Sequence, residues 1–117
     1  DEVLDCAKSA QADHPRLAND LWQAAETLRE ATQTLLDRDL PDRFAGAVPY
    51  LAAFARVLGG CYHLRAAQAG GAAHLALARI FMARVLPRNS GDLAEALAGL
   101  DDLSAISDAA LAGDFGA

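Results

Sequence analysis

Residues that favour β-sheets are scarce in this sequence of 117 residues. It holds nine Val, Ile and Thr residues in all, against 28 Ala and 18 Leu, and only 6% of it is aromatic. Ala and Leu are good helix formers, whereas sheets prefer β-branched and aromatic side chains. With 53% hydrophobic residues, the chain has enough apolar material for a core. We therefore predict an all-α single domain over residues 1–117, an up-down bundle of four to five helices with a kink or break at Pro87.

Membrane and secretion signals are also missing. No uninterrupted apolar run approaches the ~20 residues of a membrane span, and no basic start followed by an apolar segment indicates a signal peptide. The net charge of -6 argues against a nucleic-acid-binding surface. Cys6 and Cys61 show neither metal-ligand spacing nor a disulfide framework, so we predict free thiols in a reducing, cytoplasmic compartment. Because the chain opens on Asp1, we expect it to be a piece of a longer protein.

Apolar residues recur at three- and four-residue steps between Leu17 and Leu36, which predicts an amphipathic helix. His14 and Pro15 should separate it from a short helix over residues 1–13, because the residue before a proline disfavours helical geometry. Similar patterns predict helices over residues 42–69, 72–86, 92–100 and 104–111. Gly70 and Gly71 should form a turn, and residues 88–91 a loop or a distorted turn.

The third predicted helix carries two apolar stripes instead of one, and the fourth is apolar over most of its circumference. A helix that is apolar on two sides needs two bodies to pack against. We therefore expect the helical hairpin around Gly70 to have more apolar surface than its own bundle can bury. Gly59 and Gly60 predict either the close approach of another backbone or a kink. The first stripe comprises Phe44, Val48, Leu51, Phe54, Leu58 and Cys61, and the second comprises Tyr50, Val57 and Leu64.

Charge is segregated along the chain, since no acidic residue occurs from Arg43 to Gly91. One interpretation is that carboxylates of the flanking helices pair with the arginines of this middle region. The other is a cationic patch for a phosphate or an acidic partner, built from Arg79, Arg84 and Arg88.

The sequence offers few residues for catalysis. Cys61 and His63 are close in sequence, but two residues on a helix are separated by a rotation of roughly 200°, so the two side chains point apart. His63 and His74 do not match the His-x-Leu-Lys-Gly pattern of phosphotransfer modules, and His14 is typical of a solvated turn. No cluster of metal-ligand residues is visible. We therefore predict no catalytic, cofactor-binding or metal-binding residue in this segment.

Three stretches resemble the C-terminal helical domain, of the acetyl-CoA dehydrogenase C-terminal-like kind, of bacterial acyl-CoA dehydrogenases. They are Pro49-Tyr50-Leu51-Ala52-Ala53-Phe54, Leu58-Gly59-Gly60 and residues 76–87, which read Ala-Leu-Ala-Arg-Ile-Phe-Met-Ala-Arg-Val-Leu-Pro. The family pattern has a second aromatic where this chain has Met82. It also has an Ala-rich continuation where this chain has Asn89-Ser90-Gly91.

The resemblance implies that the parent enzyme uses FAD to oxidise fatty-acyl-CoA, with a catalytic glutamate that belongs to upstream domains. It implies that this segment is not catalytic by itself, packs on those domains and supports a homo-oligomer. None of the family's catalytic or flavin-binding motifs falls in this chain. Two alternatives remain at this stage: a free-standing helical module that homodimerises, and a bundle that binds a small ligand through the arginines named above.

Overall fold

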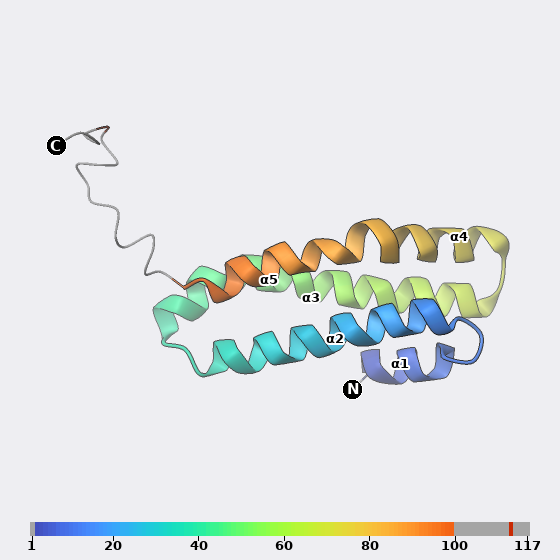
Figure 1. Ribbon diagram of the computed structural model, residues 1–117, viewed down its shortest axis with the longest axis horizontal. Coiled ribbons are helices and arrows are strands. Elements are labelled where there is room, and N and C mark those ends of the chain that lie inside the picture. Colours follow the sequence, from blue (N-terminus) through green and yellow to red (C-terminus); the bar gives the residue numbers. More distant parts are fainter. Residues whose placement is uncertain (1, 100–112, 114–117) are drawn as a thin grey trace.

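The computed structural model describes residues 2–99 and 113. The chain is all-α, as predicted. Figure 1 shows α2, α3 and a rod formed by α4 and α5 lying side by side along their length, with the short α1 beside one half of α2. The predicted helix over residues 104–111 lies outside the described residues. The elements are α1 (Glu2–Ala10), α2 (Pro15–Leu36), α3 (Leu40–Ala69), α4 (Ala72–Ile80), a π-helical turn (Phe81–Val85), a 3-10 turn (Leu86–Arg88) and α5 (Asn89–Leu97).

The first two helices form as the sequence predicts. Glu2 and Asp5 lie in the first turn of α1 and Lys8 in its last turn, where each charge opposes the helix dipole. Pro15 begins α2, at a position where its missing N–H costs no hydrogen bond. The periodic stripe of α2 lines the core through Leu17, Ala18, Leu21, Ala25, Leu28, Ala31 and Leu35.

The core side of α3 consists mostly of small residues, which corrects our assignment of its two stripes. Val57 and Leu64 of the second stripe are buried, whereas Phe44, Val48 and Leu51 of the first stripe are exposed. Small side chains let neighbouring helices approach closely, and α3 contacts α1, α2, α4 and α5. The buried residues of α3 are Gly46, Pro49, Ala53, Val57, Gly60, Cys61, Leu64 and Ala67.

The close backbone approach occurs at Gly46, not at Gly59 and Gly60. A Cβ built on Gly46 would collide with the carbonyl oxygen of Ala96 on α5. Gly59 and Gly60 instead face side chains, chiefly the ring of Phe81 and the end of Leu21. The predicted turn at Gly70 and Gly71 is confirmed, and both residues have the positive φ angles that favour glycine, 112° and 99°.

The chain does not leave helical geometry at Pro87. Of the two alternatives predicted for residues 88–91, the loop is wrong, and the helix continues through a distorted turn into α5. Val85, Leu86 and Asn89 all have right-handed helical dihedral angles. A π-helical turn precedes the proline, with the N–H of Leu86 donating to the carbonyl of Phe81. A 3-10 turn then contains Pro87. Because proline has no N–H for the usual α-helical bond, the helix changes its hydrogen-bond spacing here and continues into α5.

Candidate docking surface

The structure places the arginines of the acid-free middle region in different surroundings. Arg56 forms an ion pair with Asp92 of α5, and Arg65 pairs with Glu2 of α1 at 2.9 Å. For these two, the flanking helices supply the carboxylates, as the first interpretation of the charge pattern predicts. Arg79, Arg84 and Arg88 are exposed along the α4–α5 rod. The structure therefore does not gather those three into one buried anion site.

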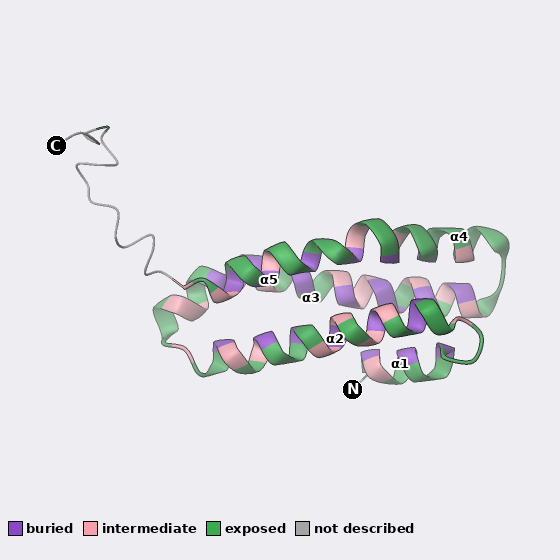
Figure 2. Ribbon diagram, in the orientation of Figure 1, coloured by how far each residue is buried: buried purple, intermediate pink, exposed green. Residues whose placement is uncertain are grey.

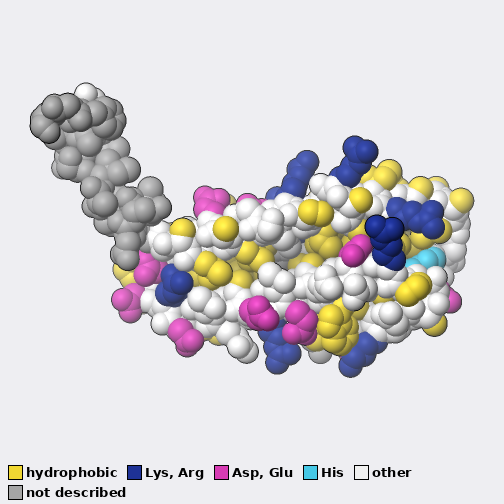
Figure 3. Space-filling model, in the orientation of Figure 1, with side chains coloured by type: hydrophobic (Ala, Val, Ile, Leu, Met, Phe, Trp, Pro, Cys, Tyr) yellow, Lys and Arg dark blue, Asp and Glu magenta, His cyan; other side chains and the backbone are white. Residues whose placement is uncertain are grey.

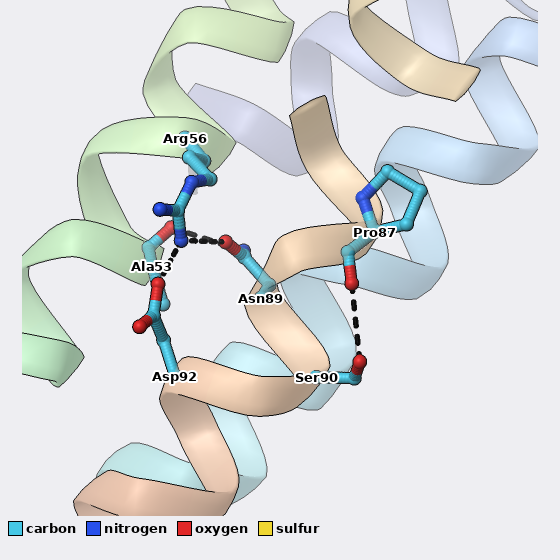
Figure 4. A network of polar contacts seen from close by, with 6 residues as sticks. All are labelled: Ala53, Arg56, Pro87, Asn89, Ser90 and Asp92. Atoms are coloured by element: carbon cyan, nitrogen blue, oxygen red, sulfur yellow. Dashed lines mark hydrogen bonds and ion pairs between the residues drawn. The ribbon is translucent and has the colours of Figure 1, made fainter. Parts of the chain in front are cut away.

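Asn89 is the centre of a polar network that joins α5 to α3 (Figure 4). Its side chain is buried, and its Nδ2 donates to the carbonyl oxygen of Ala53 at 3.1 Å. Arg56 donates to the Asn89 Oδ1 at 3.3 Å and to the carboxylate of Asp92. Sequence reasoning missed this network because it assigned Asn89 to a loop. The spacing of Asn89, Leu93 and Ala96, all on one face of a helix, is the signal that could have found it.

The titratable side chains considered for catalysis have packing partners instead. The imidazole of His63 lies against the ring of Phe81, with ring centroids 4.7 Å apart. The thiol of Cys6 donates to the carbonyl oxygen of Cys61 at 3.4 Å, a contact between α1 and α3 that the sequence did not indicate. Within residues 2–99 and 113, no three His, Cys, Asp or Glu residues converge as metal ligands would. The contacts of His63 and Cys6 thus join α3 to the turn after α4 and to α1.

A groove of about 550 Å³ lies between the α1–α2 turn and α4. Asp13, Asp20, Arg16 and Arg79 are among the charged residues that line it. The groove therefore has mixed charge, with two carboxylates and two guanidinium groups among its lining side chains. On the face drawn in Figure 3, hydrophobic side chains gather along the middle, and most Lys and Arg side chains lie toward the margins.

The most unusual surface of the domain is the outward side of α3, which we call the outer stripe. These residues recur at three-, four- and seven-residue steps and lie opposite the buried side of the helix. Figure 2 shows exposed residues repeating along α3 between the buried ones. Of the exposed residues from Phe44 to Tyr62, none carries a charge. The outer stripe comprises Leu40 (59% exposed), Phe44 (74%), Val48 (78%), Leu51 (61%), the half-buried Leu58, and Tyr62 (63%).

Further large apolar residues are exposed outside the outer stripe. Leu36 at the end of α2 is 60% exposed, and Leu77 and Ile80 of α4 are about half exposed. A further apolar hollow of about 280 Å³ lies where α2 meets α3, lined in part by Leu36, Tyr50 and Leu51. Monomeric proteins rarely leave a contiguous apolar surface larger than a few hundred Å². This surface has the character of one that another protein surface covers.

The apolar character of α3 also gives a weak membrane signal. By its length and a mean hydropathy of 1.4, α3 could cross a membrane, but 33% of its apolar window is buried in the domain. The central helix of a water-soluble bundle passes the same test, and α3 contacts helices on its other side. The signal therefore carries no argument for a membrane span.

Comparisons with known proteins place the chain in one family. Neither the search of curated proteins nor the search of solved structures returned a match. A scan against family models matched over residues 1–107, which is nearly the whole chain. With its all-α fold and outward apolar helix already described, the chain belongs to the family described as acetyl-CoA dehydrogenase C-terminal like.

Proposed function

We propose that this domain is the non-catalytic C-terminal helical domain of an FAD-dependent acyl-CoA dehydrogenase, and that it packs on the catalytic domains through the outer stripe of α3. The observation that carries the proposal is the uncharged, outward face of α3 in a chain of this family. In the complete enzyme, FAD and the catalytic base belong to the other domains, and the reaction is the oxidation of fatty-acyl-CoA in the cytoplasm. This domain contributes buried surface and supports the enzyme's homo-oligomer.

The energetic basis of the packing is the removal of the outer stripe from water. Burying apolar surface contributes roughly 25 cal/mol per Å², and the outer stripe holds several large side chains that the domain itself leaves exposed. A charge introduced there would have to be buried without a partner, which costs several kcal/mol unless the surfaces separate. The packing is therefore sensitive to single charged substitutions on the outer stripe.

The test uses the full-length enzyme encoded by the gene, compared with a variant carrying Val48→Glu and Leu51→Glu. Both residues are exposed in the domain, so its own fold should survive. We expect limited proteolysis to release the helical domain from the variant at least ten times faster than from the wild type. Thr27→Glu on exposed α2 is the matched control and should leave the rate unchanged. Equal cleavage of all three proteins would refute docking through the outer stripe.

A second candidate, homodimerisation through the same stripe, is favoured by the size of the surface. The exposed stripe side chains and Leu36 together expose on the order of 700 Å², close to the roughly 800 Å² that each partner contributes to a standard interface. If the gene encodes no upstream flavoprotein domains, this candidate replaces the first. The stripe variant should then convert a dimer into a monomer, which sedimentation equilibrium measures.

A further inference from the structure

Two thiols that lie 55 residues apart in sequence meet between α1 and α3. Cys6 is 3% exposed and Cys61 is 2% exposed, and neither forms a disulfide in this structure. The Cys6 thiol donates to the carbonyl oxygen of Cys61, 3.4 Å away, so the two residues are in direct contact. No role of the domain described so far uses this pair.

The geometry suits the formation of a bond between the two sulfurs. A disulfide requires the two Cα atoms to lie about 4.4–6.8 Å apart, which only closely packed backbones provide. The Cys6 sulfur reaches the backbone of Cys61, so the backbones of α1 and α3 are closely packed at this point. Cys6 is the only cysteine of α1 and Cys61 the only one of α3, so no competing pairing exists in the chain.

Access to the pair depends on α1, a short helix that packs against α2 and α3. It has nine residues, too few for a stable isolated helix, and its buried residues are the small Val3, Cys6, Ala7 and Ala10. Its ion pair, Glu2 with Arg65, is solvent-exposed on both sides, and exposed pairs contribute little to stability. Local opening of α1 should therefore expose both thiols without unfolding the rest of the domain.

We propose that Cys6 and Cys61 form an oxidant-responsive pair that closes into an intramolecular disulfide and fastens α1 to α3. The oxidant is a low-molecular-weight disulfide such as oxidised glutathione. The Cys6 thiolate attacks one sulfur of glutathione disulfide, and the first glutathione leaves as a thiolate. The Cys61 thiolate then attacks the Cys6 sulfur and expels the second glutathione. The two cysteines lose two electrons and two protons, and two glutathione thiols form.

Cys6 is the attacking thiol because it lies on the helix that opens. Burial, together with the neighbouring Cys6, raises the pKa of Cys61 to about 12, so its thiol stays protonated while α1 is closed. Opening of α1 removes both causes of this shift, and Cys61 can then act as the resolving thiol. The order of attack follows from the position of α1, and the proposal does not depend on the proposed function of the domain.

The test is treatment of the purified protein with oxidised glutathione, followed by intact-mass measurement. We expect a product about 2 Da lighter than the reduced protein, with no retained glutathione and no free thiols. Because the bond closes a long loop in the unfolded chain, Tm should rise by several degrees and return after reduction with dithiothreitol. Cys6→Ser and Cys61→Ser should each stop at a mixed disulfide with one glutathione.

The matched control moves one thiol to the exposed side of α1. In the double variant Cys6→Ala with Ser9→Cys, the chain keeps two thiols, but position 9 is exposed to solvent, whereas position 6 is buried. This variant should retain glutathione and should not form the closed product. The proposal is overturned if the wild type keeps glutathione on both thiols, or closes no faster than the control. It is also overturned if the wild type stays fully reduced under conditions in which the control reacts.

Discussion

At the scale of single residues, the attachment of α5 to α3 depends on Asn89. It is the one buried polar side chain among the described residues, and both ends of its amide are hydrogen-bonded, to the Ala53 carbonyl and to Arg56. A buried polar group stabilises a fold only while its partners are present. Arg56 in turn pairs with Asp92, one turn further along α5, so the network spans two helices.

Asn89→Ala should lower the free energy of unfolding by about 1–3 kcal/mol, because it leaves buried polar partners unsatisfied. Urea denaturation followed by circular dichroism measures the change. Ser90→Ala is the matched control: the Ser90 hydroxyl is exposed and donates only to the Pro87 carbonyl, so its loss should cost less than about 0.5 kcal/mol. Equal costs for the two substitutions would contradict the role assigned to Asn89.

The pKa of Cys61 makes stability depend on pH. Burial, then the side chain of Cys6, raises it to about 12 from its ordinary value of 9.0. The unfolded chain therefore releases this proton at lower pH than the folded chain. The protonated thiol's contribution is complete below pH 9.0 and is lost as the pH rises toward about 12.

Between about pH 8 and pH 10.5, the free energy of unfolding of the wild type should fall more steeply than that of Cys61→Ala. Urea denaturation at a series of pH values checks this difference. The variant controls for the other groups that titrate in the same range. Parallel curves for the two proteins would show that Cys61 titrates alike in the folded and unfolded states.

Sequence patterns could not reveal these residue contacts. The meeting of Cys6 with Cys61 depends on how α1 lies across α3, which no local periodicity encodes. Asn89 was missed for a different reason: the sequence left open whether the helix is kinked or broken at Pro87, and the helix continues because the turn before the proline adopts π-helical spacing. The scarcity of β-branched residues, by contrast, was sufficient to predict an all-α fold.

At the scale of helices, the sequence predicted the buried residues correctly for a helix that has a single apolar face. α2 has one apolar side and one polar side, and the predicted core residues Leu17, Leu21 and Leu28 are buried. α3 is apolar on both sides, so periodicity predicted two contact faces without saying which faces the domain's own core. The size of the side chains distinguishes the two faces. The face with Gly46, Ala53 and Gly60 has small side chains, which permit close packing of neighbouring helices. The face with Phe44 and Leu51 has large side chains and remains exposed.

Gly46→Ala tests the close crossing of α3 and α5. Alanine normally stabilises a helix interior by about 1 kcal/mol relative to glycine. At position 46, however, the added Cβ meets the backbone carbonyl of Ala96, which cannot move without shifting α5. We expect the substitution to destabilise the domain by about 1–3 kcal/mol, as overpacking does, in thermal and urea denaturation.

For Gly91→Ala on α5, we expect the opposite change in stability. Nothing lies within 4 Å of a Cβ built at Gly91, and the residue is exposed. Here the gain in helix propensity should raise stability by about 0.5–1 kcal/mol. A stabilising effect at both glycines would mean that α3 and α5 do not cross closely at Gly46.

At the scale of the whole domain, the two sides of α3 have different surroundings. The side with small residues gathers α1, α2, α4 and α5 into a bundle, and the outer stripe remains in water. Sequence analysis predicted a surplus of apolar surface in the hairpin around Gly70, but it did not say which stripe of α3 would remain exposed. The sequence could not identify the partner that covers the outer stripe. Apolar periodicity indicates which face of a helix is buried, but it does not indicate which surface packs against that face.

The isolated domain should therefore self-associate in solution. With the outer stripe unprotected, the apparent mass should rise with concentration in sedimentation velocity experiments, because association removes apolar surface from water. Val48→Lys should shift the protein toward monomer without changing its helical circular dichroism, since Val48 is 78% exposed and contributes little to the core. Gln33→Lys, at an exposed position on α2, adds the same charge away from the stripe and should leave association unchanged. A wild-type domain that remains monomeric at millimolar concentration would mean that the outer stripe tolerates water, and the docking role assigned to it would then be wrong.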